Sequence, residues 1–362
     1  MAVTPMVTTT SKVNGVLPSS QVYEKVSPSN VGIVVYSQSS SSASGEGSGI
    51  VMGENKDHTY TYIITCAHVI SGEGVKAVVQ LHDGTQYDAE IVGYDSRTDI
   101  GVLKIKATGF TAAEFGDSTK LTVGETVYAI GNPGGTEFFG SFTNGMVSAI
   151  SRTVRRQIGY SMECIQQTAA ISPGNSGGAV INEYGQVVGI NSLKISDSSY
   201  ELMGFAIPIS SAKEIIDDLI AYGRVPNRPK LGISYYSNTS NQQYNMIVQI
   251  KCLPAGSLII ADINADSDLA NSSAQVGDLI TAVNGKELST SEVLLEAIEN
   301  SKVGDTLTLT LCRISSNYQT KEFNVKVKLV EDTGNTTSSS SQQQQEQTTQ
   351  QDNRSFYYNP FN

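Results

Sequence analysis

The residues best placed for chemistry are a serine in a glycine-rich turn and two upstream partners. Ser176 lies in the segment Ser-Pro-Gly-Asn-Ser-Gly-Gly at 172–178. Its glycines leave the hydroxyl exposed and give backbone N–H groups room to face a substrate oxygen. Such turns are also common in ordinary loops. His68 and Asp99 precede it in one of the chain orders known for Ser–His–Asp triads. Together the three residues predict nucleophilic acyl transfer.

Each role has a competing interpretation. Ser176 could be a plain turn serine, and Asp99 could cap a turn. Asp95 and Asp117 compete with Asp99 as the carboxylate that orients the histidine. We favour Asp99 because the apolar segment 100–105 follows it directly, so its carboxylate should be buried and should need a partner.

A series of motifs in fixed order extends this pattern along the chain. They are Gly-Ser-Gly-Ile at 47–50, Thr-Cys-Ala-His at 65–68, Thr-Asp-Ile-Gly-Val-Leu at 98–103, Ile-Gly-Asn-Pro at 130–133, Val-Gly-Ile-Asn at 188–191, Gly-Phe-Ala-Ile-Pro at 204–208 and Gly-Asp-Leu-Ile at 277–280. With these motifs the chain resembles the HtrA/DegP family from about residue 22 to residue 329. The resemblance implies a mainly β fold, a chymotrypsin-like double β-barrel followed by a small α+β PDZ domain.

The same resemblance implies an ATP-independent serine endopeptidase that cleaves unfolded or misfolded proteins in quality control and the stress response. The backbone N–H groups of Gly174 and Ser176 would form its oxyanion hole. No Walker A motif is present, and no metal or organic cofactor is implied. Two alternatives remain open: a non-proteolytic chaperone or PDZ scaffold, and a processing protease with a single substrate.

Substrate preference is expected from residues near the nucleophile. Trypsin-like enzymes that cut after Lys or Arg carry Asp six residues before the serine, where this chain has Ala170, followed by Ile171. An uncharged pocket favours small or medium aliphatic P1 residues, which bury apolar surface. Leu202 and Met203 are expected in the pocket wall, although a core strand explains them equally well.

The second domain carries a candidate peptide-binding loop. Leu231, Gly232 and Ile233 match the apolar-Gly-apolar loop of PDZ domains. The glycine lets backbone N–H groups turn toward a C-terminal carboxylate, and the peptide then adds to the sheet as a strand. The chain departs from the family at 272–275, where an Ala-Gly pair is usual, so the resemblance leaves the ligand preference open.

Bulk composition limits the partners. The 362 residues are typical of about two domains. A net charge of −11 argues against nucleic acid as a main partner, because phosphate binding needs a basic face. The four cysteines form no Cys-x-x-Cys pair, so a zinc site is not expected. We interpret Cys66 as a small buried side chain, while a Cys66–Cys164 disulfide depends on geometry.

The expected domains follow from changes in pattern. Short β-branched runs between turn signals predict strands from residue 50 to 207, and a capping box at 211–214 predicts a helix that ends at Gly223. The Ser- and Gly-rich segment 37–49 is expected to be an unpacked loop. The predicted organisation is a disordered leader (1–20), a trypsin-like protease domain (21–223), a linker (224–229), a PDZ domain (230–331) and a disordered low-complexity tail (332–362).

Partners and location come from the resemblance. It implies unfolded proteins or peptides as substrates and a homotrimer built through the N-terminal segment, for which Tyr23, Val26 and Tyr36 are the candidate contacts. It also implies an extracytoplasmic protein that is exported or tethered to a membrane. The first twenty residues show neither a basic region nor an apolar one, so we expect a trimmed ectodomain or a sequence lacking its anchor.

Overall fold

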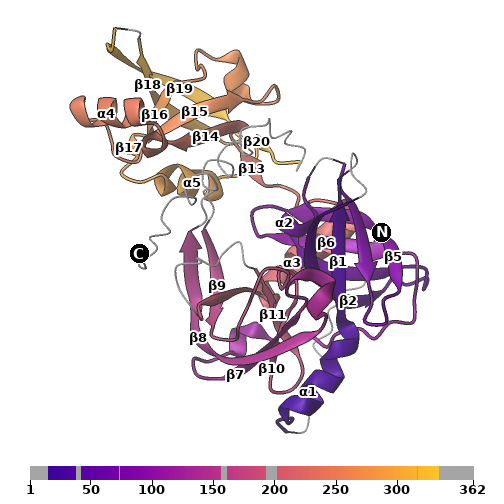
Figure 1. Cartoon of the computed structure of the whole chain (residues 1–362). Helices are drawn as coiled ribbons and strands as arrows, with labels where there is room; N and C mark the ends of the chain where they lie inside the picture. Colours follow the sequence, from indigo (N-terminus) through magenta and orange to yellow (C-terminus); the bar gives the residue numbers. More distant parts are fainter. Residues whose placement is uncertain are drawn as a thin grey trace, which may run out of the picture.

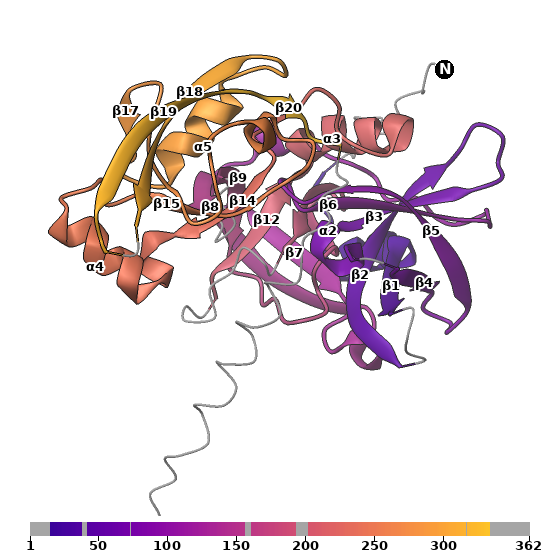
Figure 2. The same cartoon turned by 90° about the horizontal axis from the view of Figure 1, so that it is seen from above.

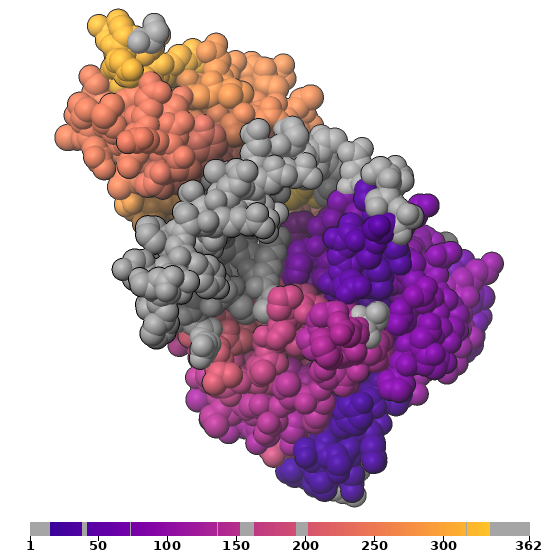
Figure 3. Space-filling view, in the orientation of Figure 1, coloured from indigo at the N-terminus to yellow at the C-terminus, as the bar shows by residue number. Residues whose placement is uncertain are grey.

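The computed structural model describes residues 15–37, 42–72, 74–155, 161–192, 202–315 and 317–333. The expected leader and tail therefore lie mostly outside the described residues. Two lobes are visible in Figure 1 and in the space-filling view of Figure 3. The first lobe, indigo to pink, holds two barrels, and the second, orange to yellow, holds the C-terminal sheet.

The first barrel is closed by six antiparallel strands in the order β1-β2-β3-β6-β5-β4. The Asp83-Gly84 turn joins β4 to β5 with Gly84 at φ +84°, a conformation that the Asp-Gly pair favours in hairpin turns. The strands are β1 (Asn30–Tyr36), β2 (Ala43–Glu54), β3 (Thr61–Cys66), β4 (Lys76–Gln80), β5 (Gln86–Asp95) and β6 (Ile100–Ile105).

The prediction of an unpacked loop over 37–49 is wrong for its second half, because β2 begins at Ala43 and pairs with β1. Two of its glycines are required by close packing. A Cβ on Gly47 would lie 2.7 Å from Val69, and one on Gly49 would lie 2.7 Å from Ile63. The glycines that suggested flexibility therefore allow a strand to lie tightly against its neighbours.

The second barrel is also closed, in the order β10-β11-β12-β9-β8-β7. Its strands are β7 (Thr126–Gly131), β8 (Ser141–Arg155), β9 (Ser161–Gln167), β10 (Ala179–Asn182), β11 (Val187–Asn191) and β12 (Gly204–Pro208). Two six-stranded antiparallel barrels confirm the predicted chymotrypsin-like fold.

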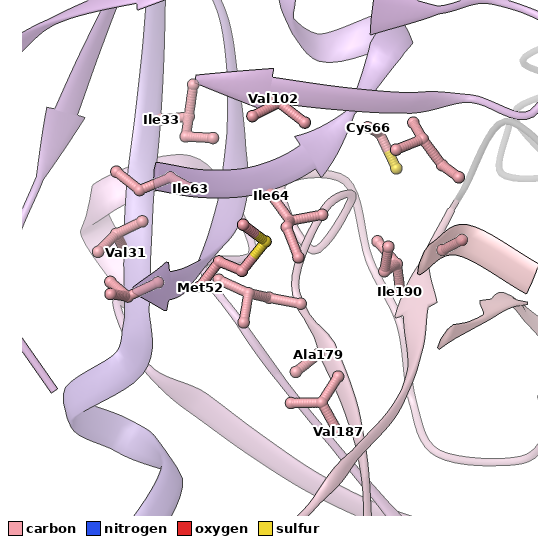
Figure 4. Close-up of a cluster of buried hydrophobic side chains, with 14 of the residues drawn as sticks. Val31, Ile33, Met52, Ile63, Ile64, Cys66, Val102, Ala179, Val187 and Ile190 are labelled. Carbon is pink, nitrogen blue, oxygen red and sulfur yellow. The ribbon is translucent and has the colours of Figure 1, made fainter. Parts of the chain in front are cut away.

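One apolar cluster joins the two barrels. Ile33 and Ile63 of the first barrel belong to the same buried cluster as Val187 and Ile190 of the second, and all four are at most 1% exposed. Figure 4 shows these side chains gathered between the strands. Burying each such side chain contributes about 1.5–3 kcal/mol, so apolar packing holds the barrels together.

Short helices connect and flank the barrels. They are α1 (Ser19–Val26), α2 (Ala67–Ile70) and α3 (Ile209–Tyr222), with 3₁₀ turns η1 (Ser27–Ser29), η2 (Ser118–Lys120) and η3 (Gly135–Phe138). Helix α1 begins two residues before the expected start of the first domain. No helix in the described part of the chain is long and apolar enough to cross a membrane.

The predicted helix is present as α3, but it begins at Ile209, two residues before the predicted capping box, so the prediction that Ser211 caps it is wrong. Ser210 instead exchanges hydrogen bonds with Ser118, each backbone N–H donating to the other's hydroxyl at 3.1 Å. A contact 92 residues away in sequence thus accompanies the helix start. The predicted stop is confirmed, since Gly223 caps the helix at φ +71°.

The C-terminal lobe is a sheet in the order β14-β15-β16-β18-β19, with β17 paired to β16. The turn Asn284-Gly285 joins β16 to β17 with both residues at positive φ, the conformation that an Asn-Gly pair adopts in a two-residue hairpin turn. The strands are β14 (Ile233–Ser237), β15 (Leu258–Ile263), β16 (Leu279–Val283), β17 (Lys286–Glu287), β18 (Thr306–Ile314) and β19 (Thr320–Lys328); the helices are η5 (Asn238–Ser240), α4 (Gln242–Ile250), η6 (Asp268–Asn271) and α5 (Glu292–Glu299).

A small strand pair connects the lobes. β13 (Pro229–Lys230) pairs with β20 (Val330–Glu331), so the entry and exit of the C-terminal lobe lie together. Figure 1 shows β13 and β20 side by side, and in Figure 2 β20 and α3 lie where the two lobes meet. The chain thus enters the second lobe at a fixed point beside the first barrel.

Candidate active site

The structure brings His68 and Asp99 together at the end of the first barrel. His68 lies on α2, directly after β3, and its Nδ1 lies 2.8 Å from Asp99 Oδ2 and 3.0 Å from Oδ1. Its backbone N–H also donates to Oδ1 at 3.0 Å. The Asp99 side chain is fully buried, whereas that of His68 is 26% exposed. This is the geometry in which a carboxylate fixes an imidazole tautomer.

Asp99 occupies a strained position in the turn before β6. Its φ of +60° lies in the left-handed region, which aspartate tolerates better than most residues. Its carbonyl accepts the N–H of Ala67 at 3.0 Å, which ties the turn to the start of α2. The competing carboxylates have other uses: Asp95 accepts the N–H groups of its own turn, and Asp117 caps η2.

Ser192 is a site residue that sequence reasoning missed. Its hydroxyl donates to Asp99 Oδ2 at 2.6 Å, and the residue is fully buried. A hydrogen bond to a charged group is about twice as strong as a neutral one. Ser192 directly follows the motif at 188–191, but nothing local indicates that its side chain reaches a carboxylate 93 positions earlier.

Ser176 lies against the strand that leads to His68. Its carbonyl accepts the N–H of Ser48 at 2.8 Å. The next residue, Gly177, has φ +87°, and a Cβ there would lie 2.4 Å from Thr65 Oγ1 and 3.0 Å from Cys66 N. Only glycine fits this approach. The turn therefore holds Ser176 beside the end of β3. That strand ends at Cys66, two positions before His68.

The peptide bond between Pro173 and Gly174, in the loop before Ser176, has a defined orientation. The carbonyl of Pro173 accepts the N–H of Gly134 at 2.8 Å, so the Gly174 N–H of the same planar peptide points the opposite way. Gly174 itself is at φ +100°, and a Cβ would lie 2.2 Å from the carbonyl oxygen of Asn132. Glycine is thus required at this position both by conformation and by space.

Ser48 and Asn132 hold the loop that carries Gly174 by hydrogen bonds. Their motifs at 47–50 and 130–133 do not by themselves indicate this role. The Ser48 hydroxyl donates to the Gly174 carbonyl at 2.7 Å and accepts the Asn132 N–H at 2.9 Å. Asn132 is fully buried and donates from its amide to the carbonyl of Val31 at 2.8 Å. The network joins β1 and β2 of the first barrel to the serine loop of the second.

Cys66 is buried beside the His68–Asp99 pair, and all four cysteines are free, so no disulfide joins Cys66 to Cys164. Its thiol donates to the Asn191 carbonyl at 3.2 Å. Burial raises the pKa of this thiol well above its usual range, and the nearby Asp99 carboxylate adds to the rise. A neutral thiol is a poor nucleophile, so the interpretation as a small buried side chain stands.

Donor atoms of Cys66, His68 and Asp99 lie within 4.8 Å of one another, a spacing that a metal ion could use. Hydrogen bonds already engage these atoms, since Nδ1 of His68 meets the carboxylate and the thiol donates to a carbonyl. Zinc ligation needs a deprotonated thiol, which the burial of Cys66 disfavours. The grouping is therefore better explained as a histidine–carboxylate pair.

The predicted S1 residues are only partly brought together. Ile171 contacts the start of β12, where a Cβ on Gly204 would lie 2.5 Å from Ile171 Cδ1. Ala170 is exposed, and Met203 packs in part against the core. Leu202 is 66% exposed, so most of its surface faces solvent. Ile171 with the first residues of β12 is thus the better-supported half of the prediction.

The predicted peptide-binding loop has its carbonyls turned inward. The Leu231 carbonyl accepts the Ser267 hydroxyl at 2.5 Å, and the Gly232 carbonyl accepts the Asn264 N–H at 2.9 Å. The N–H groups of Gly232 and Ile233 therefore point away from these partners. The Leu231 side chain is buried in the core of the C-terminal lobe. Strand β14 lies at the edge of the sheet, where another strand can add.

The three candidate contacts for oligomerisation differ in burial. Val26 is 3% exposed and belongs to the barrel core, so the prediction that it contacts another subunit is wrong. Tyr23 is half-buried and packs edge-on against Phe142 with ring centroids 5.4 Å apart. Tyr36 ends β1 and is also half-buried.

Two family models match the chain. A trypsin-like peptidase domain matches residues 47–190, and a PDZ domain matches residues 229–327. These ranges cover the strands that carry the histidine–carboxylate pair, the serine turn and the C-terminal sheet.

Curated relatives match across both lobes. The serine protease Do-like HtrA of Lactobacillus helveticus is 39% identical over 288 residues, 78% of this chain and 68% of that protein. The HtrA of Bacillus subtilis (strain 168) is 35% identical over 330 residues, 86% and 72% respectively. A relative from Chlamydia trachomatis named "Probable periplasmic serine endoprotease DegP-like" is 36% identical over 253 residues, 70% and 49%.

Solved structures are similar as well. The serine endoprotease from Yersinia pestis is 29% identical, with a TM-score of 0.56 over 87% of this chain and 99% of that one. The HtrA-type protease AlgW with a tripeptide is 26% identical, with a TM-score of 0.53 over 87% and 98%.

Proposed function

Because the chain belongs to the HtrA/DegP family of serine proteases, with a trypsin-like peptidase domain and a PDZ domain, we propose that it is an ATP-independent endopeptidase that cleaves unfolded or misfolded proteins. The observation that carries the mechanism is the fully buried Asp99 carboxylate, which accepts hydrogen bonds from His68 and Ser192 beside the serine turn. A buried carboxylate needs such partners, and this arrangement suits a general base.

In the proposed mechanism Ser176 attacks the scissile carbonyl carbon. Its hydroxyl proton passes to Nε2 of His68, whose Nδ1 hydrogen-bonds Asp99. Asp99 stabilises the imidazolium but stays ionised. The imidazolium then protonates the leaving amine, and an ester links the acyl group to Ser176. A water molecule attacks this ester with His68 again as base, which releases the acid and restores the serine.

The negative oxygen of each tetrahedral intermediate would be held by the N–H groups of Gly174 and Ser176. The hydrogen bond from the Gly134 N–H to the Pro173 carbonyl supports this assignment, because it leaves the Gly174 N–H pointing the opposite way. One such donor is typically worth ~10²–10³ in rate.

The proposed P1 preference is for Val, Ala, Ile or Leu. Ala170 and Ile171 bring no negative charge to the position from which trypsin-like enzymes bind Lys or Arg. Cleavage-site analysis of digested proteins tests this directly, and a preference for basic P1 residues would refute it.

The PDZ domain is proposed to bind C-terminal or extended peptide segments at Leu231, Gly232 and Ile233. The outward N–H groups of this loop and the edge position of β14 support a carboxylate-bound added strand. One of the similar solved structures contains a tripeptide, in keeping with peptide recognition by this family.

We also propose a homotrimer and an extracytoplasmic location. Tyr23, Phe142 and Tyr128 form an aromatic cluster at the N-terminal end of the protease lobe, in which the last two rings stack with centroids 5.0 Å apart. Tyr23 and Tyr36 retain exposed surface for another subunit. The periplasmic naming of several relatives supports the location. Analytical ultracentrifugation tests the trimer, and a protein that stays monomeric would contradict it.

Casein cleavage and labelling by a fluorophosphonate probe test the proposal. The wild type should do both without ATP, and Ser176→Ala should do neither while melting normally. Loss of the triad typically costs on the order of 10⁶ in kcat. Turnover by Ser176→Ala equal to that of the wild type would exclude this serine as the nucleophile.

A further inference from the structure

An ion pair joins the linker to the turn that ends at Asp99. Arg228 Nη1 lies 2.6 Å from Asp95 Oδ1, and the two side chains are only 18% and 10% exposed. Asp95 is the last residue of β5, and Arg228 lies 133 positions later, just before β13. Ion pairs shielded from water keep more of their strength than exposed ones.

The Asp95 carboxylate organises the whole of this turn. Oδ2 accepts the N–H of Thr98 at 3.1 Å and also its hydroxyl, and Oδ1 accepts the N–H of Arg97 at 3.3 Å. The next residue is Asp99, which is held at φ +60°. A left-handed aspartate persists only where its surroundings over-determine it, and the Asp95 carboxylate supplies part of that constraint.

The linker reaches this turn from a fixed point. A Cβ on Gly93 of β5 would lie 2.3 Å from the carbonyl oxygen of Gly223, so the end of α3 is pressed against the strand that leads to Asp95. Arg97 adds a second tie, because its guanidinium donates to the Pro229 carbonyl at 2.8 Å. The turn and the linker therefore hold each other in place.

Other charges surround the pair without replacing it. Asp332 lies 3.7 Å from Arg97, and Asp218 of α3 is close enough to Arg228 to feel its charge. A second linker arginine, Arg224, pairs with Glu331 of β20 and not with the turn. Of the two linker arginines, Arg228 is thus the one that pairs with Asp95, whose carboxylate holds the turn before Asp99.

We infer that Arg228 is a positioning residue for the reaction, acting through Asp95 on the proposed orienting carboxylate Asp99. This inference rests on the proposed function. Displacement of Asp99 would loosen His68 and lower the rate of acylation while leaving substrate contacts intact. The PDZ linker thereby becomes part of the support for the catalytic geometry.

The Arg228–Asp95 ion pair also borders a cavity. Arg228 and Asp95 line a cavity of about 260 Å³ between the lobes, together with Gly232 and Ile233 of the proposed peptide loop. Water can fill the room that a shorter side chain leaves there. We therefore expect Arg228→Gln to fold.

The test compares Arg228→Gln with Arg224→Gln in the full chain, on a small chromogenic peptide with an apolar P1 residue. Arg224→Gln is the matched control, because it removes a linker ion pair that does not touch the turn. We expect Arg228→Gln to lower kcat about 10-fold with KM unchanged, an effect typical of remote positioning changes. Arg224→Gln should keep wild-type kcat.

Two further readouts separate positioning from general damage. Arg228→Lys should recover part of the rate, since it keeps the charge but loses the planar donor pair. Asp95→Asn combined with Arg228→Gln should be no slower than the slower single variant, because the two act as a unit.

Wild-type kcat in Arg228→Gln, or equal losses in the two arginine variants, would overturn the inference while leaving the proposed function intact. Absence of cleavage and labelling in the wild type would instead remove the proposed function and with it the inference. Should Arg228→Gln fail to fold, Asp95→Asn is judged by the same criteria: a selective loss in kcat supports the inference, and an unchanged kcat refutes it.

Discussion

Replacement of Asp99 by asparagine should reverse the tautomer of His68. The carboxylate meets His68 through both oxygens, with the backbone N–H donating to Oδ1 at 3.0 Å and Nδ1 lying 2.8 Å from Oδ2. Ser192 donates to Oδ2 as well. An asparagine has only one oxygen to share among these donors.

The structure predicts which way the amide will turn. With its nitrogen at the Oδ1 position, the amide would face the partly buried N–H of His68, donor against donor, at a cost of about 1–3 kcal/mol. With its oxygen there, that N–H stays bonded and the amide nitrogen faces Nδ1. Nδ1 must then accept, so the imidazole proton moves to Nε2. The base can no longer take the proton of Ser176.

The expected loss is ~10⁴ in kcat, the size of effect seen when a triad carries the wrong tautomer. It corresponds to about 5 kcal/mol in activation free energy. The assay is peptide hydrolysis, with thermal melting to show that the fold is intact and Asp117→Asn as a matched carboxylate control. A loss below tenfold in a folded Asp99→Asn variant would refute the tautomer argument and return the role to another carboxylate.

Three other predictions follow from the site and its surroundings. Gly174→Ala should lose ~10²–10³ in kcat and also melt at a lower temperature, because its Cβ would clash with the Asn132 carbonyl and displace a proposed oxyanion donor; near-normal turnover would remove this glycine from the hole. Iodoacetamide should modify exposed Cys252 readily and leave buried Cys66 unmodified until the protein unfolds, as peptide mapping would show; early loss of Cys66 would contradict its burial. Hydrogen bonds from Thr119 lower the pKa of Asp117 from 3.8 to about 2, so its ionised form stabilises the fold above the unfolded value and the contribution fades as pH falls toward the folded one. The gap in urea midpoint between wild type and Asp117→Asn should therefore shrink on acidification, and a gap independent of pH would count against this.

Local turn chemistry was predictable because it depends on one or two residues. Asn284-Gly285 and Gly223 adopt positive φ where the sequence indicates it. The chain order of His68, Asp99 and Ser176 was also readable, since each lies beside a recognisable motif. Their proximity, however, could be expected only from the family resemblance.

Long-range pairing was the part that local patterns could not supply. The segment 43–49 is glycine-rich and polar, yet its ladder with β1 makes it a strand. The start of α3 coincides with a contact to Ser118, and Ser192 reaches Asp99 across 93 positions. Such contacts are decided by tertiary packing, which overrides local propensity.

The division of the site between two barrels bears on how the protein is made. His68 and Asp99 belong to the first barrel, whose last strand, β6, ends well before Ser176 and Ser192 are synthesised. Domains generally fold in order as a chain is translated, so the strands that carry His68 and Asp99 are made while the proposed nucleophile is still missing. A chain interrupted at that stage has no proposed nucleophile with which to cut itself or its neighbours. The proposed site is thereby complete only once Ser176, Ser192 and Arg228 have all been added to the chain.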